Sequence, residues 1–339
     1  MSVVLNNFLT EIKELNSIAI IGLSKNAGKT TTMNAILKLL NYEKVALTSI
    51  GYDGEDNDLV FNTHKPNIFI KKGMLIATAK KCVLESTIQF KILETTGFNT
   101  PLGEIIIVEA LEDGLVKLAG PSYNAQLKEV IKLLKSFKDS LVIVDGALNR
   151  KTFSDPSVCD GTILCSGMNI ANNINEVVAI TSYTLKNLQT KKLEANNEIF
   201  DLKSKPLVIF DKELNQNELK VKTTINADAL LLKQLNKSAK YLFVNGPLTD
   251  KLAQAIIRHR NNLDNITIVL NNATNNFIKE KSAEQLALAK IKVRVLHEIN
   301  VVAVAMNPNS LHMQYDSKEL CTKMRKETNV FVYDFVKGE

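Results

Sequence analysis

Short apolar runs alternate with amphipathic segments along most of the 339-residue chain. In the first half, the runs that predict strands lie at 18–21, 45–50, 141–144 and 160–167. The segments with apolar residues at helical spacing lie at 4–16, 29–40, 122–138 and 169–188. Strands that alternate with helices in this way are typical of a mostly parallel sheet covered by helices, which is an α/β fold.

The same alternation resumes after a polar stretch at 189–205 that resembles a connection between domains. The predicted strands of this second half lie at 207–210, 241–244, 266–270, 293–296, 301–305 and 330–333. Its predicted helices lie at 227–236, 249–260, 276–289 and 317–326. We therefore expect two domains, one over 1–190 and a second, Rossmann-like α/β domain over 206–339.

One pair of runs departs from the parallel pattern. Residues 104–111 and 114–120 are rich in β-forming side chains and flank Asp113-Gly114, which is a strong hairpin signal. They predict an antiparallel edge on the sheet. Ser122 is the expected N-cap of the helix that follows. Residues 71–80 fit either a mobile segment over a ligand or an ordinary amphipathic connection.

The first predicted strand runs into a glycine-bounded loop and then a helix that begins Gly-Lys-Thr. This order of strand, loop and helix is typical of a phosphate-binding P-loop, in which backbone N–H groups and the helix N-terminus face the anion. Lys29 is expected to reach the terminal phosphates and act in catalysis, and the Thr30 hydroxyl to bind Mg²⁺. The residues expected to contact nucleotide here are Gly22, Ser24, Lys25, Asn26, Ala27, Gly28, Lys29, Thr30 and Thr31.

Two carboxylates follow predicted strands and are candidates for metal binding and catalysis. Asp145 ends the run 141–144 and precedes a glycine, as in a Walker-B strand, which delivers a carboxylate to the edge where the P-loop lies. Asp53 lies in the loop after 45–50, where a solvated acidic turn is the alternative. Asn169, after the strand at 160–167, is a candidate contact to the base. No Asn-Lys-x-Asp guanine signature occurs, which favours ATP.

The composition narrows further the kinds of partner, metal site and location that we expect for this protein. The net charge of +6 comes from 42 basic and 36 acidic residues, without an aromatic-spaced basic stripe, so we expect no nucleic-acid partner. The four cysteines lack CxxC spacing, and Cys159 and Cys165 flank an apolar strand, where buried thiols are expected rather than metal ligands or a disulfide. We find no signal-peptide pattern and no apolar run of membrane length, which predicts a cytoplasmic protein without a membrane partner.

The P-loop has five residues between Gly22 and Gly28, one more than the usual spacing. In this it resembles the dethiobiotin synthetase and cobyrinic acid synthase branch of P-loop proteins. That resemblance implies ATP and Mg²⁺ as cofactors, and a possible homodimer. The chain departs from the biotin enzyme at Ile50-Gly51-Tyr52-Asp53, where the substrate lysine and proline are missing, and at Asp145, where that enzyme has glutamate. The second half also lacks the Cys-His pair of the cobyrinic acid synthases.

The whole chain resembles the P-loop subunit of the reactivating factor for lysine 5,6-aminomutase, an enzyme of lysine fermentation. The stretches that carry this resemblance are the P-loop at 22–30, Thr100–Glu104, Leu118–Ser122, Val144–Ala147 and Val304–Pro308. The resemblance implies a protein partner, either the adenosylcobalamin-dependent aminomutase or a second reactivase subunit, and ATP turnover that drives exchange of damaged cofactor. The alternatives are an ATP-dependent ligase or kinase of a small metabolite, and a nucleotide-binding scaffold without turnover.

Overall fold

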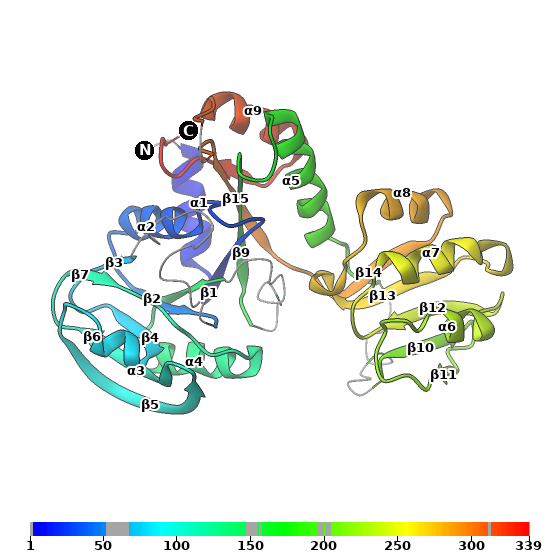
Figure 1. Ribbon diagram of the computed structural model, residues 1–339, viewed down its shortest axis with the longest axis horizontal. Helices are drawn as coiled ribbons and strands as arrows, with labels where there is room; N and C mark the ends of the chain where they lie inside the picture. Colours follow the sequence, from blue (N-terminus) through cyan, green and yellow to red (C-terminus); the bar gives the residue numbers. More distant parts are fainter. Residues whose placement is uncertain are drawn as a thin grey trace. The chain divides into compact units, whose positions relative to one another are not determined.

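The computed structural model describes residues 3–51, 68–146, 155, 158–194, 200, 205–310 and 313–338. The chain divides into two compact α/β units (Figure 1). Unit 1 comprises Met1–Ser182 and Asn300–Glu339, and unit 2 comprises Tyr183–Ile299. Among the described helices, none has both the length and the apolar character needed to cross a membrane.

Unit 1 is built on a nine-stranded sheet with the order β16-β15-β9-β1-β8-β2-β4-β6-β5. From β16 to β4 every neighbouring pair is parallel, whereas β6 and β5 are antiparallel to their neighbours. The carboxyl ends of β15, β9, β1, β8 and β2 therefore share one edge of the sheet. The strands are β1 (Ser17–Gly22), β2 (Val45–Ser49), β4 (Leu75–Ala79), β5 (Phe90–Thr100), β6 (Gly103–Ala110), β8 (Leu141–Asp145), β9 (Gly161–Gly167), β15 (Val301–Asn307) and β16 (Phe331–Tyr333).

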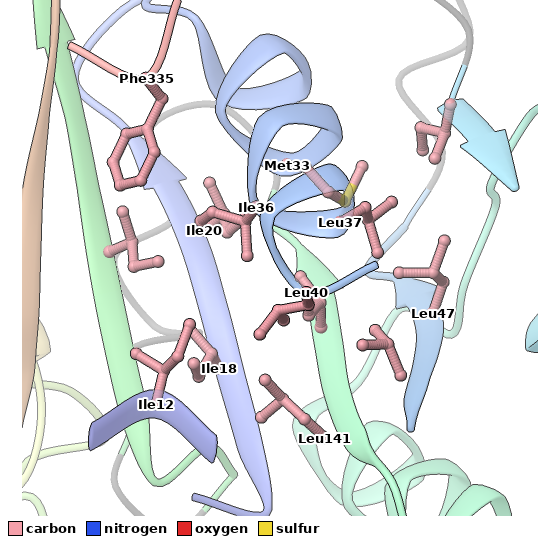
Figure 2. Packing of buried hydrophobic residues seen from close by; sticks show 14 of the residues in the cluster. Ile12, Ile18, Ile20, Met33, Ile36, Leu37, Leu40, Leu47, Leu141 and Phe335 are labelled. Atoms are coloured by element: carbon pink, nitrogen blue, oxygen red, sulfur yellow. The ribbon is translucent and has the colours of Figure 1, made fainter. Parts of the chain in front are cut away.

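Helices cover this sheet through apolar faces. The core seen in Figure 2 joins Met33, Ile36 and Leu37 of α2 to Ile18 and Ile20 of β1. The alternate β1 side chains lie outside this cluster, as expected for a strand covered on both faces. The helices with residues in unit 1 are α1 (Val3–Lys13), α2 (Lys29–Leu39), α3 (Lys80–Leu84), α4 (Asn124–Phe137), α5 (Ile174–Leu188, to Ser182) and α9 (Ser317–Glu327).

Unit 2 has a five-stranded sheet with the order β11-β10-β12-β13-β14. Strand β10 is antiparallel to both neighbours, and β12, β13 and β14 are parallel. Phe200, Phe210, Tyr241 and Phe243 pack together as its aromatic core. The elements are β10 (Leu207–Asp211), β11 (Gln216–Glu218), α6 (Asp228–Gln234), β12 (Ala239–Val244), α7 (Asp250–Arg258), β13 (Thr267–Asn272), α8 (Glu280–Leu288) and β14 (Lys292–His297).

The predicted α/β class, the mostly parallel sheet and the antiparallel edge agree with this architecture, but the predicted domain limits do not. Residues 300–339, assigned to the second domain, belong to unit 1, where β15 pairs with β9 and β16. Six of the seven β15 residues are buried, which requires packing on both faces. Unit 2 is therefore inserted between the first part of α5, which ends at Ser182 in unit 1, and β15.

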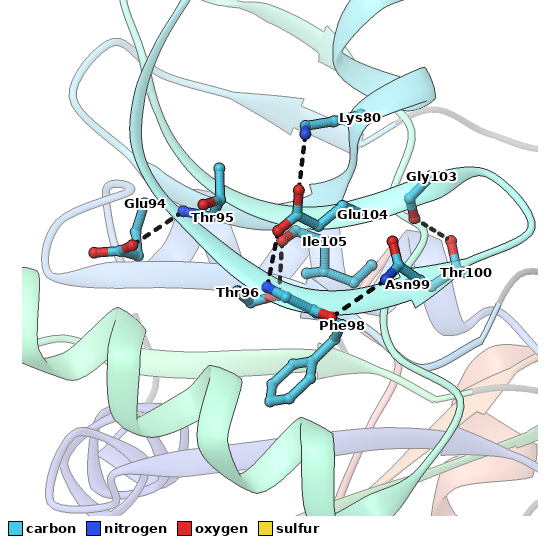
Figure 3. A network of polar contacts seen from close by, with 11 residues as sticks. Lys80, Glu94, Thr95, Thr96, Phe98, Asn99, Thr100, Gly103, Glu104 and Ile105 are labelled. Carbon is cyan, nitrogen blue, oxygen red and sulfur yellow. Dashed lines mark hydrogen bonds and ion pairs between the residues drawn. The ribbon is translucent and has the colours of Figure 1, made fainter.

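The hairpin predicted between residues 104–111 and 114–120 does not form, because the two segments pair with other strands. Strand β6 pairs with β5 and β4, whereas β7 (Gly114–Val116) pairs with β3 (Ile68–Ile70) in a separate two-stranded sheet. Lys72 N–H donates to Asp113 Oδ1 at 2.8 Å, which holds the turn toward β3. In the β5–β6 hairpin, Glu104 accepts hydrogen bonds from Lys80 Nζ and Gly97 N–H, at 2.7 and 2.8 Å (Figure 3).

Three smaller expectations also change. Helix α4 begins after Tyr123, which makes no side-chain cap bond, so the Ser122 N-cap is wrong. Residues 75–79, left open as a mobile segment or a connection, form the fully buried strand β4. The polar stretch after α5 is not a plain connection, because Leu193 and Phe200 are buried in the core of unit 2.

Candidate functional site

The glycine-bounded loop lies at the carboxyl end of β1, between the sheet and α2. Leu23 N–H donates to Cys165 O at 3.0 Å, so the loop starts attached to the neighbouring strand β9. Asn26 and Gly28 both have positive φ, 59° and 91°. These left-handed residues turn the chain sharply before α2, and glycine is the residue that adopts such a φ most readily.

The N-terminus of α2 is open to an anion. Its cap residue, Gly28, has no side chain, and no acidic residue occupies the first helical turn. The first N–H groups of a helix lack intrahelical partners and carry the positive end of its dipole. The Ser24 Oγ is also buried and has no hydrogen-bond partner. An orphaned hydroxyl in the loop that leads to an uncapped helix start fits a ligand with several oxygen atoms.

The Lys29 side chain folds back over Gly22, the last residue of β1. A Cβ atom added to Gly22 would lie 3.1 Å from Lys29 Cγ and Cδ and 3.2 Å from its Nζ. Glycine at position 22 therefore leaves the space that the lysine side chain fills. The two ends of the predicted motif meet, and the ammonium is held within the loop rather than extended into solvent.

Asp145 is placed at the same edge by its neighbours in the sheet. It is in register with Ile20 of β1 and Ser49 of β2. Its carbonyl oxygen accepts from Ile50 N–H at 3.2 Å and from Ser49 Oγ at 3.3 Å. The backbone is thus anchored on the β2 side, and the partly buried carboxylate lies where β8 ends.

The charges of Lys29 and Asp145 both reach the buried thiol of Cys165 on β9. Burial raises the pKa of this thiol to about 12, the hydrogen bond with Thr32 and the Lys29 ammonium lower it, and Asp145 raises it. The cysteine is therefore a neutral packing group at neutral pH. All four cysteines are buried and free, which confirms the buried thiols predicted for Cys159 and Cys165.

Two asparagines, one in the turn after β9 and one at the end of β15, hold the loop. The Nδ2 atoms of Asn169 and Asn307 donate to Asn26 O, at 2.7 and 3.2 Å. Asn169 was predicted to contact a base; here it braces the loop backbone. Asn307 was not among the predicted site residues, because its strand was assigned to the second domain. The Asn-Pro that ends this apolar run was the available signal, but sequence alone did not place the strand beside β9.

The segment after β7 fixes the exit of β2. Gly51 N–H donates to Pro121 O at 2.9 Å, and Gly120 N–H to Gly51 O at 3.3 Å. A Cβ at Gly120 would lie 1.6 Å from Ser49 O, so only glycine fits this approach. Asp53, expected a few residues further on, lies outside the described residues. Of the predicted metal set, the described part of the chain contains Thr30 and Asp145, and within it no three His, Cys, Asp or Glu side chains form a metal-binding group.

Asn307→Ala tests the nucleotide binding that the sequence predicts for this loop. The substitution deletes one neutral hydrogen bond to the loop, a contribution of about 0.5–1.5 kcal/mol, so the affinity for the predicted ligand, ATP, is expected to fall roughly two- to tenfold without loss of the fold. The matched control is Asn300→Ala, which deletes a 3.2 Å amide bond to Asp160 O at the other end of the same strand. Calorimetric titration of both variants with ATP measures this, and equal affinities would contradict the role given to Asn307.

Comparisons of this chain with protein-family models, with curated proteins and with solved structures returned no match.

Proposed function

We propose that the protein is a P-loop ATPase that couples binding and hydrolysis of Mg-ATP to the remodelling of a partner enzyme. The observation that carries this proposal is the loop itself, in which Lys29 folds over Gly22 beside an uncapped helix N-terminus. A cation, free N–H groups and the orphaned Ser24 hydroxyl together suit a polyphosphate.

In this function Lys29 neutralises charge on the terminal phosphates, and the first turn of α2 binds their oxygens. Thr30 and Asp145 are the described residues that would hold Mg²⁺, since hydroxyl and carboxylate oxygens are its preferred ligands. The ion would neutralise charge that develops on the phosphates. Asn169 and Asn307 position the loop through Asn26.

Coupling to a partner is supported by the course of the chain. Strand β15 ends in Asn307, which contacts the P-loop, and begins at Val301, directly after unit 2. A change in the loop therefore acts on a strand that is covalently continuous with the inserted unit. The resemblance to the aminomutase reactivating factor makes an adenosylcobalamin-dependent lysine 5,6-aminomutase, or a second reactivase subunit, the proposed partner.

The second candidate is a ligase or kinase of a small metabolite. The five-residue spacing of the loop, shared with the dethiobiotin synthetase branch, favours it. The two functions differ in what stimulates turnover. ADP release should be measured with the chain alone, with inactivated aminomutase, and with a metabolite library. Stimulation by the aminomutase alone supports the first function, stimulation by a metabolite supports the second, and no turnover under any condition contradicts both.

Asp145→Asn is expected to lower Mg-dependent ATP turnover at least about a hundredfold, because an amide lacks the charge that holds the ion. Binding of ATP measured in EDTA should change little. Asp139→Asn is the control, since Asp139 precedes the same strand and its side chain is 95% exposed. Equal ATP turnover of Asp145→Asn and Asp139→Asn would show that Asp145 does not hold the metal ion.

A further inference from the structure

Unit 2 contains a cavity of about 790 Å³ that the nucleotide site does not use. It is lined by the C-terminal part of α5, by α8, and by the beginnings of β13 and β14. Figure 1 shows α8 beside the last strands of this sheet. Pockets for small molecules typically span roughly 300–1,000 Å³, so this cavity has room for one.

The interior of the cavity is apolar. Ile266, Ile278, Leu286 and Ile291 contribute buried side chains to it, and Ala283 of α8 adds a small apolar side chain to the lining. Such a lining favours the apolar body of a ligand over water, because removing apolar surface from water is favourable.

The charged side chains around the cavity are of one sign. Lys186, Lys290, Lys292 and Arg294 line it, and among its described lining residues there is no Asp or Glu. The Tyr183 hydroxyl donates to Ile278 O at 2.6 Å, and its pKa is raised to about 12 by burial and by Asp250 and Glu280. Tyr183 is therefore neutral at physiological pH, and the four basic side chains of the lining outnumber the two carboxylates, those of Asp250 and Glu280, whose charge acts on Tyr183.

One buried acceptor in the lining is unused. Asn187 is 8% exposed, and its Nδ2 donates to Asn276 O at 3.3 Å. Its Oδ1 is buried and has no hydrogen-bond partner. A buried acceptor without a donor costs free energy, so a ligand that supplies an N–H or O–H group would stabilise the site.

We propose that this cavity binds a small molecule with an apolar body, an anionic group and one N–H or O–H donor. The apolar lining receives the body, the basic side chains attract the anion, and Asn187 Oδ1 accepts from the donor. This site lies wholly in unit 2, so the proposal stands or falls independently of the ATPase function.

The test uses anilinonaphthalene sulfonate, a fluorescent probe that has all three features, with the full chain. Octanoate and octyl phosphate should displace it, whereas octylamine should need at least about tenfold higher concentration, since the lining repels a cation. The two anions together show whether a carboxylate or a phosphate is preferred. Displacement by octylamine as effective as that by octanoate would overturn the proposal.

Three variants locate the probe. Ala283→Trp fills the cavity and should reduce probe affinity at least about tenfold. Lys292→Glu with Arg294→Glu should have a similar effect, whereas Lys281→Glu, on α8 but outside the lining, should not. Asn187→Leu should weaken binding of the probe, which carries an N–H donor, but leave the affinity for octanoate unchanged. Thermal unfolding checks each fold, and unchanged probe binding in both folded Ala283→Trp and Lys292→Glu/Arg294→Glu would place the probe elsewhere.

Discussion

Replacement of Lys29 by alanine is expected to lower the affinity for Mg-ATP at least about a hundredfold and to leave the fold intact. Each hydrogen bond to a charged group contributes about 1.5–3 kcal/mol, and the ammonium would lose more than one such bond to the phosphates. The side chain is only partly buried and does not belong to the apolar core, so unfolding should be little affected. Calorimetric titration and thermal unfolding measure the two effects.

The control is Lys38→Ala, which removes an exposed lysine from the last turn of the same helix. Gly22→Ala provides a graded variant, because its Cβ would lie 3.1 Å from the Lys29 chain and displace it while the charge remains. We expect the Mg-ATP affinity of Lys38→Ala to match that of the wild type. The affinity of Gly22→Ala should lie between those of the wild type and Lys29→Ala. If Lys29→Ala bound Mg-ATP as the wild type does, the phosphate site would not be at this loop.

The second large effect is expected on stability, from Gly120→Ala. The added Cβ would lie 1.6 Å from Ser49 O and 2.4 Å from Ser49 C, both backbone atoms at the end of β2. Backbone cannot rotate away as a side chain can, so the ends of two segments must separate. We expect a loss of about 3–5 kcal/mol in the free energy of unfolding, at the upper end of single-substitution effects.

Gly73→Ala separates this steric effect from the cost of glycine's own conformation. Gly73 has a φ of 82° and open space around its Cβ position, so alanine there should cost only about 1–2 kcal/mol. Urea unfolding of both variants gives the comparison. A Gly120→Ala variant as stable as Gly73→Ala would show that the two segments are not held this closely.

The features that local sequence determines were predicted well. Helix and strand positions follow from apolar spacing over a few residues, and the strand, loop and helix order around Lys29 lies within one stretch of chain. The end of β8 at Asp145 was predicted for the same reason, because the apolar run before it is typical of a buried strand. These predictions need no knowledge of which strands are neighbours.

Pairing between distant segments was not predictable from such spacing. Strand β5 has mostly exposed or half-exposed side chains and two register irregularities, so it gives no clean alternation. The sequence of β15 is apolar and predicts a strand, but unit 2 separates it from β9 in the sequence. Its pairing with β9 therefore could not be predicted from local spacing. The role of Asn307 follows from the pairing of β15 with β9, and that of Gly120 from the approach of the segment after β7 to the end of β2, so neither was predictable from local spacing.

The inserted position of unit 2 has a consequence for biosynthesis. Asn26 and Asn307, one of the two side chains that donate to its carbonyl oxygen, lie 281 positions apart. At about 5–20 residues per second of synthesis, roughly 15 to 55 s pass between their appearances, and unit 2 is made complete within that interval. The loop at 22–28 therefore lacks its Asn307 contact until β15 has been made, and a chain released early has the Gly-Lys-Thr motif without that contact.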